Sequence, residues 1–487
     1  MKTKILLTFI FAVSMQFCFG QINFENTYGG IHRDIGYSVQ QTNDNGYIIT
    51  GVTKSFGDST SDNVYLIKTD ENGDTLWTKT FGDINDDCGF SVLQTNDNGY
   101  IVVGSNRISI DTVYMYIIKT DINGDTLWTK TLTSRYNFGY SVQQTNDNGY
   151  IIVGETKDNY NYGCESDVYI VKINENGDTL WTRTYGGPYE GTLNNNDIGQ
   201  FVLQTNDNGF IIAGGTEKWG YSGWKNIYLI RTDINGDTLW TKTYGETCEV
   251  CENWAFSMTK TNDSGYVICG YIQNYDTYGK DVYIMKIDSI GNQQWYKTYG
   301  GIYDDVGRSI YKTNDNGYII TGYTESFGVG NCDVYLIKTD INGDILWART
   351  YGGAENDVGY SVQQTNDNGY IISGSTRSFG NGSSDVYLIK TDENGNIEFI
   401  NNFNKKISLD IFPNPNNGTF TIQLDEAHSN VSIYVYDLNG RIVYSKNGLF
   451  DQLKTEVIKL PDVSDGLYYL HLSSENINAF EKIIIKK

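Results

Sequence analysis

The chain has 487 residues, of which 39% are hydrophobic, with 53 glycines, 39 tyrosines and only four prolines. This composition excludes an intrinsically disordered chain, because large apolar side chains are abundant enough to form cores, and it is typical of strands joined by tight turns. The formal net charge of −23 excludes nucleic acid as a favourable partner, since an acidic surface repels a phosphate backbone.

Residues 1–20 form a segment that is separate from the fold. Lys2 and Lys4 precede an apolar stretch from Ile5 to Phe19, and the small residue Gly20 follows it. A positive start, an apolar run and a small residue together are typical of a secretory signal peptide. We therefore expect the mature chain to be exported, into a compartment that permits disulfides.

The segment Phe24–Gly30 aligns with Trp77–Gly82, which is the fourth strand of a repeat, but no first three strands precede it. We predict that it completes the last repeat unit and closes a ring, which removes exposed strand edges. The segment Ile397–Phe403 competes for the same place with a poorer match.

The hexamer Thr-Asn-Asp-Asn-Gly-Tyr, or a near copy, recurs seven times. Its copies start at Thr42, Thr95, Thr145, Thr205, Thr261, Thr313 and Thr365, at spacings of 53, 50, 60, 56, 52 and 52 residues. A period near 50 residues with strand-forming composition indicates a β-propeller rather than a helical solenoid. We therefore predict an all-β chain with a seven-bladed propeller over residues 21–403.

Each repeat contains four segments with strand character, a to d. In the first repeat they are Tyr37–Thr42, Tyr47–Gly51, Val64–Thr69 and Thr75–Phe81. Asn-Gly, the strongest short hairpin signal, separates a from b and c from d. Strands b and c are apolar almost without alternation, which indicates sheets covered on both faces by neighbouring blades.

A tryptophan follows the glycine of each c–d hairpin by four residues. The copies are Trp77, Trp128, Trp181, Trp240, Trp295 and Trp347, with Phe399 in the seventh place. We expect these rings to pack between adjacent blades. The pattern Asp-x-x-Gly-x-x-x-Trp resembles the docking repeat of quinoprotein-like propellers and, with spacings one residue longer, the Asp-box of sialidases. In those families the motif is structural, so the resemblance implies no catalysis.

Two polar positions also recur in each repeat. The position before strand a holds Asp34, Asp87, Asn137, Asp197, Asn253, Asp305 and Asp357, and the end of strand c holds Lys68, Lys119, Lys172, Arg231, Lys286, Lys338 and Lys390. Carboxylates near a propeller mouth could hold a cation, but sevenfold repetition favours capping of the turn that enters strand a. We expect the cations to pair with carboxylates of the c–d hairpin between blades.

We predict no catalytic residue and no metal site in the propeller. Only three histidines are present, His32, His428 and His471, which excludes a histidine-based triad or a multi-histidine zinc site there. Cys248 and Cys251 are spaced as a small-loop disulfide, half a metal site or a redox pair, and export favours the disulfide. We expect no cofactor.

Function is expected where the repeats differ, on the face where the b–c and d–a connections emerge. Blades 3 to 5 carry aromatic residues in these connections, namely Tyr160, Tyr162, Tyr189, Trp219, Tyr221, Trp224, Tyr275 and Tyr278. Aromatic clusters on a rigid scaffold suit sugar stacking or protein docking. We predict a ligand site here; the alternative is that these rings pack on their own loops.

After the linker 404–406 the repeat stops, and residues 407–487 follow a different pattern. Strands alternate with Asn-Gly and Asp-Gly turns, which predicts a small Ig-like β-sandwich. Ser-Leu-Asp-Ile-Phe-Pro-Asn-Pro at 408–415, Asp-Leu-Asn-Gly-Arg at 437–441 and the final Lys-Ile-Ile-Ile-Lys resemble the type A C-terminal sorting domain of type IX secretion substrates. The resemblance implies the type IX machinery as a partner and a secreted or outer-surface location in a Gram-negative bacterium.

These features predict a monomeric, non-enzymatic binding or adhesion protein with a glycan or protein ligand. A secreted propeller-type glycoside hydrolase and a structural surface spacer are the alternatives. A sialidase would need converging acids and an arginine cluster. The propeller arginines share no common strand position, being Arg33, Arg107, Arg135, Arg183, Arg231, Arg308, Arg349 and Arg377.

Overall fold

The computed structural model describes residues 23–57, 61–109, 112–132, 136–157, 166–186, 196–217, 225–245, 252–273, 279–397, 409–428, 431–436, 442–447, 453–460, 463–474 and 477–487. The regular elements in these ranges are β-strands, and they include no helix long and apolar enough to cross a membrane. The chain divides into two compact units, Met1–Glu398 and Phe399–Lys487. The finer limits at 20, 403 and 406 fall outside the described residues and stay predictions.

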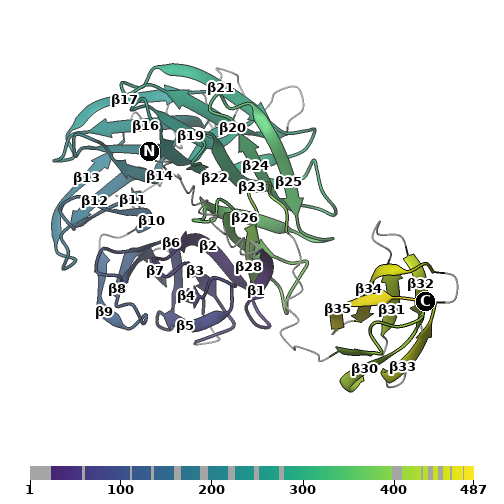
Figure 1. Ribbon diagram of the computed structural model, residues 1–487. Helices are drawn as coiled ribbons and strands as arrows, with labels where there is room; N and C mark the ends of the chain where they lie inside the picture. The colour runs from purple at the N-terminus through teal and green to yellow at the C-terminus, as the bar shows by residue number, and fades with distance from the viewer. Residues whose placement is uncertain are drawn as a thin grey trace, which may run out of the picture. The chain divides into compact units, whose positions relative to one another are not determined.

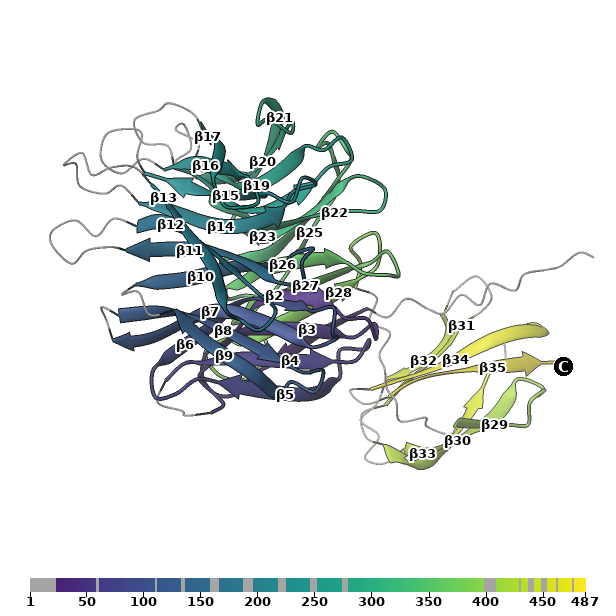
Figure 2. The same cartoon turned by 90° about the vertical axis from the view of Figure 1, so that its left-hand side faces the viewer.

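Four-stranded antiparallel sheets form the first unit (Figures 1 and 2). The first blade contains β2 (Asp34–Gln41), β3 (Tyr47–Thr53), β4 (Asn63–Thr69) and β5 (Thr75–Phe81), and the second contains β6 (Asp86–Gln94), β7 (Tyr100–Ser109), β8 (Thr112–Thr120) and β9 (Thr126–Leu132). The third contains β10 (Asn137–Gln144), β11 (Tyr150–Lys157), β12 (Ser166–Ile173) and β13 (Thr179–Tyr185), and the fourth contains β14 (Asp197–Gln204), β15 (Phe210–Thr216), β16 (Asn226–Thr232) and β17 (Thr238–Tyr244). The fifth contains β18 (Asn253–Lys260), β19 (Tyr266–Gln273), β20 (Lys280–Ile287) and β21 (Gln293–Tyr299), and the sixth contains β22 (Asp305–Lys312), β23 (Tyr318–Thr324), β24 (Asp333–Thr339) and β25 (Ile345–Tyr351).

The seventh blade combines the two ends of the repeat region. Strands β26 (Asp357–Gln364), β27 (Tyr370–Thr376) and β28 (Asp385–Thr391) are joined by β1 (Phe24–Tyr28), which pairs antiparallel with β28. Strand β2 packs on β26 and β27 in the way that β6 packs on β2 and β3, so the ring closes. The prediction that Phe24–Gly30 completes this blade is confirmed, and with it the seven-bladed fold.

The hydrophobic core lies between neighbouring blades. Strands β3 and β4 are buried along their whole length, because blades cover both faces of each sheet. One cluster joins Ile48 and Leu66 of the first blade to Val92 and Tyr100 of the second. Each such side chain stabilises the fold by roughly 1.5–3 kcal/mol through burial. The apolar runs in strands b and c of the sequence are therefore the cores of the blade interfaces.

The recurring tryptophans pack half-buried between blades, as predicted. The ring of Trp77 lies 5.9 Å from that of Tyr100 in the next blade, and a Cβ on the hairpin residue Gly124 would come within 2.8 Å of the indole. In the seventh place Phe24 lies 6.1 Å from Tyr47. The assignment of this place to Phe399 was therefore wrong, because β1 supplies the outer strand; Phe399 itself lies outside the described residues.

The cation at the end of strand c pairs within its own blade. Lys68 Nζ lies 2.9 Å from Asp44 Oδ2 of the a–b hairpin, and the other six repeats form the same pair. The predicted partner, the c–d hairpin, was wrong, because the pairing of β3 with β4 places Tyr47 opposite Thr69 and brings the a–b hairpin beside Lys68. The c–d hairpins pair instead with strand d of the preceding blade, as in Lys79–Asp125 at 2.8 Å.

The acidic residues that begin strand a cap the preceding turn. Asp34 accepts the backbone N–H of Gly30 at 2.8 Å and the Ser55 hydroxyl at 2.6 Å, and Asp305 and Asp357 accept the equivalent bonds. These contacts favour the capping interpretation over a cation site. Among the described residues, no three or more His, Cys, Asp or Glu side chains gather to hold a metal.

The second unit is a sandwich of two sheets. One sheet contains β29 (Leu409–Phe412), β30 (Thr419–His428) and β33 (Leu453–Lys459), and the other contains β32 (Ile442–Asn447), β31 (Ser432–Tyr436), β34 (Gly466–Ser474) and β35 (Ile477–Ile485). Alternate residues of the strands, such as Phe420 and Ile422 or Leu470 and Leu472, point into one shared core. The strands separated by Asn-Gly and Asp-Gly turns in the sequence predicted a sandwich of this kind.

Candidate functional site

A β-bulge in the inner strand of each blade turns one side chain toward the propeller axis. In β2 the register shifts between Gly36 and Ser38, which leaves Tyr37 without a partner on β3. Bulges of this kind re-aim side chains. The same shift occurs in all seven inner strands, and the residues that it re-aims are Tyr37, Phe90, Tyr140, Gln200, Phe256, Arg308 and Tyr360. We call these seven residues the channel ring.

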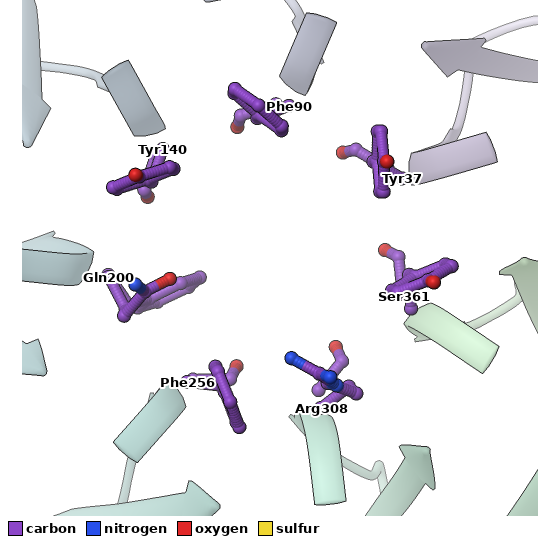
Figure 3. A pocket seen from close by; sticks show the side chains of 14 residues that line it. Tyr37, Phe90, Tyr140, Gln200, Phe256, Arg308 and Ser361 are labelled. Carbon is purple, nitrogen blue, oxygen red and sulfur yellow. The ribbon is translucent and has the colours of Figure 1, made fainter. Parts of the chain in front are cut away.

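The channel ring surrounds a central cavity of ≈ 270 Å³ (Figure 3). The residue after each bulge also lines it, and is Ser38, Ser91, Ser141, Phe201, Ser257, Ser309 or Ser361. Five of these serine hydroxyls accept a backbone N–H of the neighbouring blade at 3.3–3.4 Å, as Ser361 does from Val39. The serines therefore join the blades while facing the cavity.

One part of the channel ring is a continuous row of aromatic side chains. Tyr360 and Tyr37 have ring centroids 5.1 Å apart, Tyr37 and Phe90 are 5.4 Å apart, and Phe90 and Tyr140 are 5.4 Å apart. The hydroxyl of Tyr140 donates to Glu155 at 2.9 Å. These contacts are tilted or edge-on, which is the favourable geometry for aromatic pairs.

The rest of the channel ring comes from blades 4 to 6 and contains the two polar residues of the ring. Gln200 stands in the fourth blade, Phe256 in the fifth and Arg308 in the sixth (Figure 3). The guanidinium carbon of Arg308 lies 4.3 Å from the centre of the Phe256 ring and 6.0 Å from that of Tyr360. Aromatic faces stabilise a cation by roughly 0.5–2 kcal/mol.

A second pocket, which we call the lateral pocket, adjoins the channel between blades 4 and 5. It has a volume of ≈ 280 Å³ and shares Gln200 and Phe256 with the central cavity. Its other lining residues are Asn196, Ile198, Glu217, Lys225, Trp254 and Tyr271. They come from the ends of strands that meet the b–c and d–a connections, which is the face that the sequence predicted for the ligand site.

Charged groups at the lateral pocket are bonded to one another. Lys225 Nζ lies 3.9 Å from Glu217 Oε1 and 3.8 Å from Glu252 Oε1. The second oxygen of Glu217 accepts Asn196 Nδ2 at 2.6 Å, and that of Glu252 accepts the Tyr271 hydroxyl at 3.4 Å. Each glutamate therefore accepts one hydrogen bond through one oxygen and faces the Lys225 ammonium at ion-pair distance through the other. The same Lys225 ammonium lies 5.7 Å from the Trp254 ring.

The predicted ligand residues Tyr160, Tyr162, Tyr189, Trp219, Tyr221, Trp224, Tyr275 and Tyr278 all lie outside the described residues, as do Cys248 and Cys251. Three other cysteines, Cys88, Cys269 and Cys332, are described and are free thiols. Residues 218–224 connect Glu217 to Lys225, so the predicted region and the lateral pocket adjoin in the chain.

Sequence reasoning missed the channel ring. The signal was present, because the residue that follows the Gly or Ala of strand a is aromatic in five repeats and is Gln200 or Arg308 in the other two. The propeller arginines share no common strand position, so the place of Arg308 in this ring appears only when the residue that follows Gly307 is compared with its equivalents in the other six inner strands.

Comparison with known proteins identifies the second unit. Residues 410–486 match the family described as the secretion system C-terminal sorting domain. The chain is therefore an exported protein that engages the type IX secretion machinery and is released or held at the outer cell surface. No curated protein sequence matches the chain.

Solved structures with a likeness to the chain are distant. One is PorZ, described as a bacterial surface component of the type IX secretion system of Porphyromonas gingivalis, with 10% identity over 94% of this chain and 60% of that chain and a TM-score of 0.41. Another is puromycin hydrolase, with 14% identity over 72% of this chain and 50% of that chain and a TM-score of 0.42. A putative exo-β-1,3-galactanase from Bifidobacterium bifidum s17 has 15% identity over 54% of this chain and 92% of that chain, with a TM-score of 0.33. The chain spans about 60% of the PorZ chain that it matches.

Proposed function

We propose that this exported propeller is a non-catalytic binding protein that holds a glycan or protein ligand on the blade 4–6 side of its channel. The observation that carries this proposal is the break in the channel ring. The ring is aromatic except at Gln200 and Arg308, and the lateral pocket adjoins it at the first of these residues. If the channel ring served packing alone, there would be no reason for two of its aromatic positions to hold Gln200 and Arg308.

The contacts of the lateral pocket support binding rather than hydrolysis. A glycosidase uses one carboxyl group as a general acid and a second as base or nucleophile, with free access to the substrate. One oxygen of Glu217 accepts a bond from Asn196 and one of Glu252 accepts a bond from Tyr271, and the other oxygen of each faces Lys225 at 3.8–3.9 Å. Such a network orients polar groups for recognition.

We keep the eight aromatic residues of blades 3 to 5 as proposed ligand contacts. Their support is position in the chain: the segment with Trp219, Tyr221 and Trp224 begins after Glu217 and ends before Lys225. A stacked aromatic contact contributes on the order of 1 kcal/mol, so several are needed for useful affinity.

The test is an array of glycans and extracellular proteins probed with the mature chain. The variant Lys225→Ser/Glu252→Asn places at both positions the residues that the seventh blade carries, Ser384 and Asn356, and is expected to fold normally. We expect the wild type to bind a defined ligand and the variant to bind it at least tenfold more weakly. The control is Lys297→Ser on the outer strand β21. It removes an exposed ion pair to Asp344 and leaves binding unchanged. A wild type that binds nothing, or a variant that binds equally, contradicts the proposal.

The glycoside hydrolase alternative rests on one observation, which is that Glu217 and Glu252 both lie within 4 Å of one lysine. Release of sugar from an array glycan by the wild type, and its loss in Glu252→Gln, would establish hydrolysis in place of simple binding.

A further inference from the structure

We propose that the central cavity binds the carboxylate of an acidic sugar, a uronic acid, with Arg308 as the residue that contacts the charge. The inference rests on the proposed binding function and names the ligand class. It follows from the bonding of Arg308, from the serines around the cavity and from the aromatic rings beside it.

Arg308 lacks an acidic partner, in contrast to three other propeller arginines. Arg33, Arg183 and Arg231 form ion pairs with Asp62, Asp237 and Asp207. Within the described part of the chain, Arg308 forms no ion pair, and its Nε is buried without a hydrogen-bond partner. A buried donor on a cation is costly unless an acceptor is supplied, and a planar carboxylate fits the guanidinium fork.

The serines of the cavity are available as further donors. Ser257, Ser309 and Ser361 each accept a backbone N–H through Oγ, so a lone pair of the oxygen is already used. In the described residues no acceptor receives their O–H groups, which leaves these protons for a ligand. Donors that line a cavity favour a ligand rich in acceptor oxygens, as sugars and carboxylates are.

The aromatic neighbours of Arg308 provide the second part of sugar recognition. Phe256 and Tyr360 lie on either side of it in the channel ring, and sugar C–H faces pack on aromatic rings. The cavity of ≈ 270 Å³ is close to the lower end of ligand pockets, which begins at about 300 Å³. This volume suits one sugar unit or the end of a short chain.

The net charge of −23 restricts the ligand further. A polysulfated or polyphosphorylated chain would be repelled at long range, whereas a single carboxylate on a largely neutral saccharide meets only the local field of Arg308. A peptide C-terminus also carries one carboxylate, so the test includes a peptide probe. The aromatic rings of Phe256 and Tyr360 beside Arg308 favour the acidic sugar.

The test is calorimetric titration of the full mature chain with three probes at equal ionic strength: methyl glucuronide, methyl glucoside and an N-acetylated dipeptide with a free carboxylate. We expect the glucuronide to bind at least tenfold more tightly than the other two. In Arg308→Tyr, which places the tyrosine of Tyr37 and Tyr360 in the same ring position, this preference disappears while the melting temperature stays within a few degrees of the wild type. Arg349→Gln, an exposed arginine over Trp347 on an outer strand, retains the preference.

A second variant keeps the outcome decisive if Arg308→Tyr alters folding. Arg308→Tyr/Tyr360→Arg moves the guanidinium to the adjacent ring position, and we expect it to recover part of the glucuronide affinity. Equal affinity of the wild type for glucuronide and glucoside, or for the dipeptide, overturns the acidic-sugar assignment. If the array ligand still binds and its binding depends on Lys225 and Glu252, only the acidic-sugar assignment fails and the proposed binding function stands. If no array ligand binds, the proposed binding function fails as well.

Discussion

Trp254 of the fifth blade occupies the space that a side chain at Gly215 of the fourth blade would fill. A Cβ at Gly215 would lie 2.3 Å from Cε3 and Cζ3 of the indole. The equivalent position in the other blades holds Val52, Ser105, Glu155, Tyr271, Tyr323 or Ser375. Gly215 and Trp254 are therefore a matched pair, and Trp254 also lines the lateral pocket.

Gly215→Val introduces the side chain of the first blade, Val52, and is expected to destabilise the propeller by about 1–3 kcal/mol, as overpacking does. Trp254→Ile introduces the residue found at Ile35 and Ile198. In the double variant the two changes should compensate, giving a coupling energy of at least about 1 kcal/mol in chemical denaturation. Simple additivity of the two single changes would show that the residues do not share this space.

A second prediction concerns the last residue of strand d. In five blades it is a tyrosine whose hydroxyl donates to the hairpin glycine carbonyl of the next blade at 2.5–2.6 Å, as Tyr299 does to Gly343. The first blade has Phe81 at this position. Phe81→Tyr should therefore stabilise the propeller by roughly 0.5–1.5 kcal/mol, and Tyr299→Phe should destabilise it by about 1–3 kcal/mol. Thermal unfolding that moves in the same direction for both would contradict this bond.

A third prediction concerns pH. Burial and the nearby Asp34 carboxylate raise the pKa of Asp385 to about 6, above that of an unfolded aspartate. The folded state therefore binds the proton more tightly, so the stability due to this group is present below about pH 4 and is lost as the pH rises through 6.

Asp385→Asn tests this, because Asn63 and Asn226 stand at the same position in other blades. The variant should melt higher than the wild type at pH 8 and no higher at pH 4. The difference in melting temperature between wild type and variant reports on Asp385 alone, because the Lys68–Asp44 pair and its equivalents are present in both proteins. In those pairs, hydrogen bonds lower the aspartate pKa despite burial. A difference independent of pH would show that Asp385 keeps an ordinary pKa.

A fourth prediction concerns export. Deleting Ile407–Lys487 should leave the propeller folded, since the two units have separate cores, but should hold it in the periplasm. Cell fractionation should find the truncated chain there, with the melting temperature of the full chain's first unit. Normal amounts in the medium would show that another signal directs export.

The blades and their closure could be predicted because they depend on local rules repeated along the chain. Asn45-Gly46 specifies a hairpin by backbone geometry alone, and Phe24–Tyr28 matches strand d without its partners. The alignment of Phe24 with Trp77 already implied the seventh aromatic residue, whereas the partner of Lys68 could not be predicted, since it depends on which hairpin lies beside strand c. The channel ring depends on bulges in seven separate strands, which single-strand patterns do not reveal, and so Gln200 and Arg308 looked like ordinary variation.

The most direct test of the proposed binding function is a crystal structure of the mature chain with the ligand found on the array. We predict that the ligand contacts Gln200, Phe256 and Arg308 in the channel and reaches Lys225 in the lateral pocket. A ligand bound on the outer strands or on the second unit, with the channel ring unchanged and uncontacted, would contradict the proposed site.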